Sequence, residues 1–189
     1  MNIKTTYTCL NKQIFTDEVF SLVPIRWEDR YKIMQWRNEQ IFHLRQNKIL
    51  TVEEQNAYFE NVISKLFDQE QPDQILFSML QREMCIAYGG LVHIDWKDKN
   101  AEISFVMNTD LEASFFEYYW TIYLKFIQNI AFLQLKLFKI FIYAFDLRPH
   151  LYPVLIKNGF DLETKLKRHI KIGKQFKDVV IYTKYKTNE

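Results

Sequence analysis

Two kinds of apolar pattern along the chain predict β-strands. Where apolar and polar residues alternate, one face of a strand packs on a core and the other faces water, whereas a nearly continuous apolar run is typical of a strand covered on both faces. The run KIFIYAF is of the second kind and predicts a central strand. In all, the pattern predicts seven strands, at residues 18–25, 74–80, 85–96, 100–108, 139–145, 161–171 and 175–185. We expect residues 1–16 to be an irregular lead-in.

Helical spacing and helix-end signals predict four helices, at residues 27–39, 51–67, 111–132 and 153–158. Thr51 and Glu54 have the spacing of a capping box. Pro153 stands at the start of the last helix and Gly159 just past its end, which are the positions where helices favour these residues. The third helix is apolar almost all round, so we expect it to be buried. The predicted stripes are Trp27, Tyr31 and Met34 in the first helix, and Val52, Gln55, Phe59, Val62 and Leu66 in the second.

The order of these elements, β-α-α-β-β-β-α-β-α-β-β, predicts an α/β fold. A hairpin meander followed by a helix and a covered strand implies a mixed sheet of about seven strands with helices on both faces. The 189 residues fit one domain, and the 48% apolar share supports a sizeable core. The sequence contains no internal repeat and no Pro/Gly-rich linker. We therefore expect a single domain over residues 1–189.

Composition argues against several classes of function. The formal net charge is only +2 and the basic residues are scattered, so we expect no nucleic-acid surface; the patch at residues 165–168 is typical of a solvated strand end. The two cysteines make no disulfide framework, and no charged-then-apolar leader opens the chain, which favours a reduced, cytoplasmic setting. Polar residues interrupt the longest apolar stretch, at 121–138, so we expect no membrane span. No clustered His/Cys spacing indicates a metal.

A polar face on the hairpin at residues 91–106 is the main candidate for chemistry. If the hairpin closes symmetrically about residues 98–99, alternation places four polar side chains on one face: His93, Asp95, Glu102 and Ser104. Asp95 would then lie directly opposite Glu102, and their repulsion would make one carboxylate a better base near neutrality. The opposite face would hold Val92, Ile94, Trp96, Ala101, Ile103 and Phe105. From the residues alone, a solvated hairpin face is an equally good interpretation.

Four stretches of the chain resemble the GNAT N-acetyltransferase family. RWEDRYKIMQWRNEQ is similar to its first helix, ending in the Trp-Arg-Asn of the branches that act on ribosomal proteins and sugars. ILTVEEQNAYFENVI resembles the second helix, LIKNGFDLE the exit from the last helix, and GKQFKDVVIYTKY the closing strand. The resemblance covers about residues 18–185. Its nearest branch acetylates 4-amino sugars carried on a nucleotide, as in pseudaminic acid synthesis.

This resemblance implies a GNAT-like fold and transfer of an acetyl group from acetyl-CoA to a primary amine, without a metal. Glu102 would be the base, with His93 and Asp95 tuning it and Tyr152 as an acid. The acceptor, favoured to be a nucleotide-linked amino sugar, would contact Trp36, Arg37, Asn38 and Ser104. For Arg37 and Asn38, a helix C-terminal charge and cap are an equally good interpretation. The cofactor would contact Val106, Met107, Asn108, Ala113, Ser114, Phe115 and Arg148.

One departure from the family concerns the turn that should bind the pyrophosphate of acetyl-CoA. The family signature there is Gln/Arg-x-x-Gly-x-Gly/Ala, whereas residues 109–114 contain no glycine. We expect Asp110 to cap the following helix and Glu112 to lie in its first turn, so that two carboxylates would weaken binding of the cofactor. Two alternatives stay open, an acetyltransferase for protein α-amines and a GNAT-fold binding module without a cofactor site. A homodimer is also open.

Overall fold

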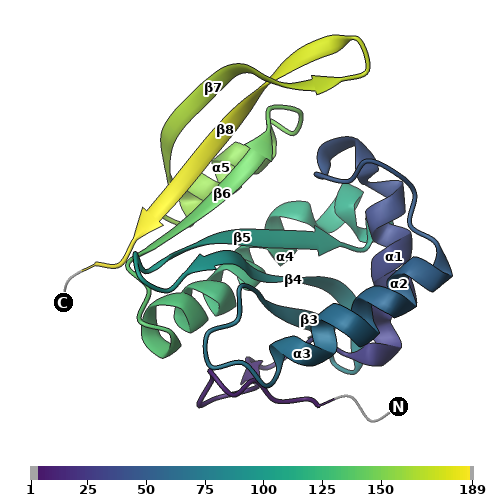
Figure 1. Cartoon of the computed structure of the whole chain (residues 1–189). Coiled ribbons are helices and arrows are strands. Elements are labelled where there is room, and N and C mark those ends of the chain that lie inside the picture. Colours follow the sequence, from purple (N-terminus) through teal and green to yellow (C-terminus); the bar gives the residue numbers. More distant parts are fainter. Residues whose placement is uncertain (1–3, 188–189) are drawn as a thin grey trace.

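A twisted sheet of eight strands runs through the molecule in the computed structural model, which describes residues 4–187 (Figure 1). The strand order is β1-β2-β3-β4-β5-β6-β8-β7, and every neighbouring pair is antiparallel except the parallel pair β5 and β6. The strands are β1 (Phe15–Thr16), β2 (Phe20–Pro24), β3 (Ile75–Gln81), β4 (Met84–Asp95), β5 (Asn100–Met107), β6 (Lys139–Phe145), β7 (Asp161–Ile172) and β8 (Gln175–Tyr185). This confirms the predicted mixed α/β sheet. The additional strand, β1, is too short to show a period in the sequence.

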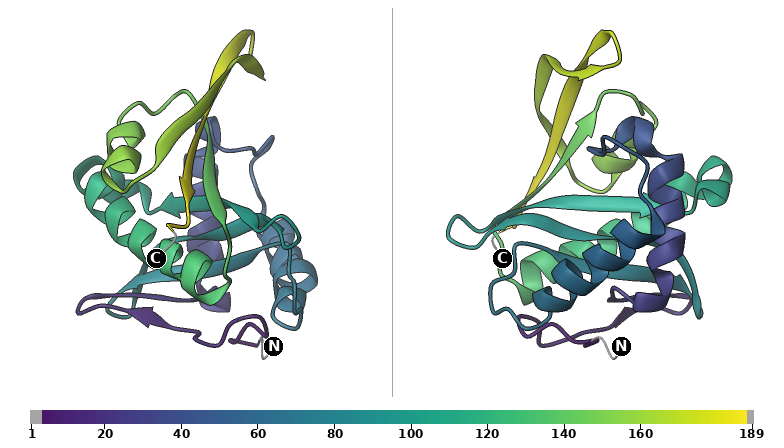
Figure 2. Two further views of the ribbon diagram at one scale, coloured as in Figure 1. Left: turned by 90° about the vertical axis from the view of Figure 1, so that its left-hand side faces the viewer. Right: turned by 45° about the vertical axis from the view of Figure 1, so that its right-hand side comes forward.

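Helices cover both faces of the sheet, as predicted, with α1 to α3 on one face and α4 and α5 on the other (Figures 1 and 2). The helices are α1 (Arg30–Glu39), α2 (Val52–Tyr58), α3 (Ser64–Leu66), α4 (Thr109–Asn129) and α5 (Leu151–Lys157). Short 3₁₀ turns precede and follow α1 (Trp27–Asp29 and Ile41–His43), and π turns follow α2 and α4 (Phe59–Ile63 and Ile130–Gln134). Within residues 4–187, no helix combines the length and apolar character needed to cross a membrane.

Local deviations from the α-helix change which residues are buried. The capping box of Thr51 and Glu54 is confirmed. The π turn after α2 accommodates an extra residue, so Ile63 is buried and Val62 is exposed, contrary to the predicted stripe. In α1 the buried residues are Ile33 and Trp36 rather than the predicted stripe, whose Tyr31 is exposed. The 3₁₀ turn at Trp27–Asp29 has fewer residues per turn than an α-helix. Positions counted from Trp27 at α-helical spacing therefore do not fall on the buried face of α1.

The register predicted for the hairpin of β4 and β5 is wrong. Glu102 lies opposite Val92, and Asp95 lies opposite Asn100, because a β-bulge separates Val92 from Asp95. Val92 therefore shares a face with Glu102. The carboxylate of Asp95 accepts a hydrogen bond from the backbone N–H of Asp98 (2.8 Å) and holds the turn. The two carboxylates do not form the predicted pair.

The same bulge brings His93 to Glu102. Simple alternation after Val92 would turn His93 to the other face, but His93 adopts a left-handed backbone conformation with φ of 51°. Its Nε2 atom lies 3.9 Å from Oε2 of Glu102. The imidazole and one carboxylate of the predicted cluster are thus adjacent, through a backbone feature that the sequence pattern did not indicate.

The parallel pairing of β5 and β6 ends after three residue pairs, from Asn100–Lys139 to Glu102–Phe141. Beyond Glu102 no ladder pairing joins the two strands in the described chain, and β6 turns away with the hairpin of β7 and β8 (Figure 1). The result is a wedge-shaped opening inside the sheet, with α4 behind it. Residues on the facing edges of β5 and β6 keep backbone hydrogen-bonding groups that no neighbouring strand uses.

The position of Ile103 at this opening yields a test of the fold. Ile103 is buried, so Ile103→Asp should place an unpaired carboxylate in an apolar environment at a cost of several kcal/mol. Because that cost approaches the total stability of a domain, about 5–15 kcal/mol, we expect the variant to lose its cooperative thermal transition in calorimetry. Ile49→Asp, at an exposed loop position, is the matched control and should melt as the wild type does. A cooperatively melting Ile103→Asp would contradict the described packing.

Candidate active site

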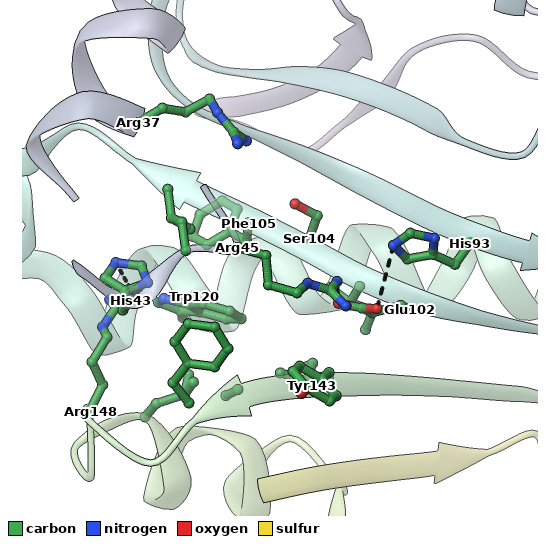
Figure 3. A pocket seen from close by; sticks show the side chains of 16 residues that line it. Arg37, His43, Arg45, His93, Glu102, Ser104, Phe105, Trp120, Tyr143 and Arg148 are labelled. Carbon is green, nitrogen blue, oxygen red and sulfur yellow. Dashed lines mark hydrogen bonds and ion pairs between the residues drawn. The ribbon is translucent and has the colours of Figure 1, made fainter. Parts of the chain in front are cut away.

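A cavity of about 460 Å³ fills the wedge between β5 and β6 (Figure 3). Its inner walls are mostly apolar and include Phe105, Trp120, Ile142, Phe145 and Leu151. Polar side chains line the rest: Arg37, His43, Arg45, His93, Glu102, Ser104, Tyr143 and Arg148. They come from α1, from the loop that follows it, from three strands and from the connection between β6 and α5. An apolar cavity with a few convergent polar groups is the usual form of a small-molecule site.

Glu102 is the only carboxylate among the residues that line this cavity in the described chain, and only 6% of its surface is exposed. It forms an ion pair with Arg45, and the guanidinium of Arg45 also lies over the ring of Tyr143, 4.9 Å from its centroid. Arg45 thereby connects the loop after α1 to both β5 and β6.

A second cavity, of about 270 Å³, lies between the sheet and the helices α1 and α2. It meets the first cavity at Arg37 and Ser104, which line both. Arg37 donates hydrogen bonds to the hydroxyl of Tyr88 (2.6 Å) and to Oε1 of Gln46 (3.0 Å). The neighbouring Tyr88 raises the pKa of Arg37. Within residues 4–187 no carboxylate forms an ion pair with Arg37, so its charge is available to a ligand.

Several predicted site residues lie elsewhere. Trp36 is buried in the core, and Asn38 fixes the following loop by hydrogen bonds with both backbone groups of Leu50 (2.8 and 2.9 Å). The Tyr152 hydroxyl donates to the carboxylate of Asp146, and its pKa is raised by burial and by that carboxylate. Tyr152 lines neither cavity, and neither does Asp95. We therefore do not assign a catalytic role to either residue.

The glycine-free turn before α4 satisfies its own groups. Asn108, not Asp110 as predicted, caps the helix by accepting a hydrogen bond from the backbone N–H of Asp110 (3.0 Å). The Thr109 hydroxyl donates to the carboxylate of Glu39 (2.5 Å). Glu112 lies in the first turn, as predicted, and forms an ion pair with Arg148. The predicted pyrophosphate site is thus occupied by interactions within the protein.

Of the residues predicted to bind the cofactor, only Arg148 lines the wedge cavity. Val106 and Met107 are buried in the sheet, and Ala113, Ser114 and Phe115 lie on the exposed side of α4. Burial lowers the pKa of Arg148 while its ion pair with Glu112 opposes that effect. Arg148 also lies 3.0 Å from Nε2 of His43, whose pKa is lowered to about 3 by burial and by this arginine. His43 is therefore neutral at physiological pH.

Among the cavity residues that were not predicted as site residues, four carry polar side-chain atoms: His43, Arg45, Trp120 and Tyr143. They belong to different segments, and nothing in their spacing relates them. Together with the edges of β5 and β6, they give the cavity apolar walls beside backbone donors and acceptors that no neighbouring strand uses.

Comparison with known proteins identifies relatives of this architecture. A family model described as an acetyltransferase (GNAT) domain matches residues 22–181. Among solved structures, the chain is similar to a spermidine N-acetyltransferase from Vibrio cholerae in complex with CoA and spermine, at 16% identity over 89% of this chain and 96% of that chain, with a TM-score of 0.75. Mutant forms of the spermidine/spermine N-acetyltransferase from the same organism match at 14% identity, over 89% and 95% of the two chains, with a TM-score of 0.74. No curated protein matches the sequence significantly.

The ion pair of Glu112 and Arg148 yields a prediction about CoA binding. In Glu112→Gln the buried charge of Arg148 loses its partner, so the free protein should lose about 1–3 kcal/mol of stability. The same change removes a carboxylate that repels the phosphates, so CoA should bind about five- to tenfold more tightly in titration calorimetry.

Glu117→Gln is the control, because Glu117 lies on the exposed side of α4 and pairs with Lys157 of α5. It should change neither the stability nor the CoA affinity by a comparable amount. If Glu112→Gln binds CoA no more tightly than the wild type, the turn before α4 is only a connection.

Proposed function

The chain belongs to the GNAT acetyltransferase family and is an acetyl-CoA-dependent acetyltransferase, and on that premise we propose that its acceptor is the primary amine of a small anionic molecule, with a nucleotide-linked amino sugar favoured. The observation that carries this proposal is the uncompensated charge of Arg37 at the junction of the two cavities. A partly buried guanidinium that has no carboxylate as an ion-pair partner can bind the oxygens of a phosphate or carboxylate group on a ligand. Two of its nitrogens already donate to neutral side chains, which orients the group.

The carboxylates near the cavities argue against a polyamine acceptor. A polycation needs free negative charge, but the cavity carboxylates within residues 4–187 are Glu102 and Glu54, which already pair with Arg45 and Lys48. The solved relative contains spermine, and its identity of 16% establishes a shared fold alone. An anionic acceptor agrees better with the arginines that surround the site.

The hairpin of β7 and β8 adds positive charge beside the same opening. Residues 165–177 contain six basic residues and no acidic one, and of the six Lys165 is paired with Asp146 and Asp178. The ring of His169 lies 6.3 Å from that of Tyr143, which lines the cavity, and next to it Arg168 is exposed. Such a charge distribution attracts an anionic acceptor toward the mouth of the cavity and disfavours a cationic one.

Glu102 is the proposed general base. Arg45 comes from a loop and its side chain is 47% exposed, so an anionic acceptor can attract it away and release Glu102 to take the proton that the amine loses. His93, 3.9 Å away, is placed to pass this proton toward solvent. The amine nitrogen attacks the thioester carbonyl of the bound acetyl-CoA, the C–S bond breaks, and CoA leaves as a thiolate that takes a proton from solvent. Ser104 lies at the junction where donor and acceptor would meet.

The direct test is an acetylation assay on three amines: a nucleotide-linked amino sugar, spermidine and a peptide α-amine. We expect the first to have the highest kcat/KM. Arg37→Gln should raise the KM for this acceptor about 10- to 100-fold, which corresponds to the loss of hydrogen bonds to a charged group, and should change the KM for an uncharged amino sugar little.

Arg30→Gln is the matched control for this variant. Arg30 lies on the same helix but lines neither cavity, since it donates to Asn56 and packs on the ring of Trp27. It should leave both KM values near those of the wild type. A preference for spermidine, or equal effects of the two substitutions, would refute the proposed acceptor class.

Glu102→Gln tests the proposed base. Loss of a general base typically lowers the rate about 10²–10⁴-fold, so kcat should fall by that factor while CoA affinity stays near the wild-type value. Asp95→Asn removes another carboxylate of the hairpin, which holds a turn outside the cavity, and should leave kcat within about threefold. An unaltered kcat in Glu102→Gln would exclude Glu102 from the reaction.

A further inference from the structure

A β-bulge interrupts the pairing of β7 with β8 between Leu166 and Ile170. Three residues of β7, numbers 167–169, stand there against one residue of β8, Asp178. Within the bulge Arg168 adopts a left-handed backbone conformation with φ of 49°. This conformation is strained for a residue other than glycine, and such strain persists where surrounding contacts hold it, often at functional sites. The bulge is therefore a feature whose function needs an explanation.

The bulge turns the ring of His169 toward the wedge cavity. Across the intervening strand β8, Tyr143 of β6 lies level with Thr164 of β7. Regular alternation would place His169, an odd number of residues after Thr164, on the opposite face of the sheet. Its ring nevertheless lies 6.3 Å from that of Tyr143, which lines the cavity. Bulges re-aim side chains in this way next to active sites.

The bulge in β4 has the same effect on another histidine. His93 has a left-handed conformation itself, with φ of 51°, and its imidazole lies 3.9 Å from the carboxylate of Glu102. His169 follows a left-handed residue and lies beside Tyr143. Two imidazoles thus flank the cavity, one on the β4 side and one on the β7 side, and both reach it through an irregular strand.

Asp178 holds the bulge of β7. Its Oδ1 atom accepts a hydrogen bond from the backbone N–H of Arg168 (2.7 Å), and its Oδ2 atom lies 3.3 Å from Nζ of Lys165. Its backbone carbonyl accepts a hydrogen bond from the N–H of Asp146 (2.9 Å), in the connection between β6 and α5. The left-handed residue is therefore fixed by a side chain, at a point where strand pairing is interrupted.

The imidazole of His169 is available to a ligand. His169 is exposed, and its ring nitrogens have no hydrogen-bond partner among residues 4–187. A histidine ring can donate a hydrogen bond to a hydroxyl or phosphate oxygen. Figure 3 shows Arg37 and Tyr143 on opposite sides of the cavity. A ligand in the cavity can therefore meet His169 with a part that Arg37 does not contact.

We propose that His169 is a specificity-determining residue for the acceptor and that Asp178 positions it through the bulge of β7. The inference rests on the proposed function, since it has the imidazole of His169 donate a hydrogen bond to a sugar or phosphate oxygen of the acceptor. A nucleotide-linked amino sugar offers such oxygens on both sides of the cavity. A polyamine has no oxygen and cannot make this contact.

The test is a double-mutant cycle in the acetylation assay with a nucleotide-linked amino sugar. His169→Ala removes the donor and should raise the KM about 3- to 10-fold, while kcat and CoA affinity stay within about twofold of the wild type. Asp178→Ala should raise the KM by a similar factor, because the bulge is no longer held. The double variant should have the KM of His169→Ala alone, since both changes remove one interaction.

Two further variants separate positioning from a general structural role. Asp178→Asn keeps an oxygen that accepts from the N–H of Arg168, so it should restore a KM near that of the wild type. Asp161→Ala removes an exposed carboxylate at the start of the same strand and should change neither KM nor kcat. Thermal melting identifies any loss of folding. If Asp178→Ala does not fold, the KM of His169→Ala decides alone.

A wild-type KM in His169→Ala would overturn the proposal, and so would additive effects of the two alanine substitutions. The ranking of amines by the wild-type enzyme separates this failure from a failure of the proposed function. If the wild type prefers the amino sugar but His169→Ala does not change its KM, only the role of His169 is refuted. If the wild type prefers spermidine, the acceptor class and the role of His169 are refuted together.

Discussion

The site depends on the early end of the pairing between β5 and β6. A parallel ladder that continued past Glu102 would fill the wedge with backbone hydrogen bonds and leave no cavity. Two residues further on, the carbonyl of Ser104 accepts a hydrogen bond from the hydroxyl of Tyr123 on α4 (2.7 Å), which ties β5 to the helix behind it. Gly89 permits this arrangement, because a Cβ atom there would lie 2.1 Å from the same carbonyl oxygen.

Charged side chains hold the open wedge in place of the ladder. Arg45 connects the loop after α1 to Glu102 on one edge and to Tyr143 on the other. At the opposite end Arg148 connects the β6–α5 connection to Glu112 and His43. Both arginines line the cavity, and an ion pair can exchange partners more readily than a strand ladder can reopen. Stability of the free protein and access for ligands are therefore coupled through the same residues.

Local sequence patterns predicted the strands and the helix ends. They did not predict the features that depend on contacts between distant segments of the chain. Period and end signals identified the strand KIFIYAF, the capping box at Thr51 and the turn after α5, where Gly159 adopts φ of 81°. The bulge at His93 was not predictable, because a left-handed conformation at a non-glycine residue leaves no pattern in the sequence.

For the candidate site, Glu102, His93, Ser104 and Arg37 were recognised from the hairpin pattern and the family resemblance. Arg45 and Trp120 were not, since they reach the cavity from segments about 57 residues before and 18 residues after Glu102 in the chain. Only the folded chain brings an exposed loop arginine and a helix tryptophan to the same cavity. Chemical type alone does not distinguish them from an ordinary surface or core residue.

The glycine-free turn before α4 forms contacts within the protein where the family resemblance predicts a phosphate site. Glycine loops bind phosphate through backbone N–H groups that approach the ligand closely. Here Asn108 already accepts from one of these groups, and Thr109 is bonded to Glu39, so the helix end has fewer free donors. The nearby positive charge is instead that of Arg148, whose guanidinium Glu112 occupies in the free protein. A phosphate that binds at this end must therefore compete with a carboxylate of the protein itself, so that the affinity is set by the exchange of one anion for another on a single arginine.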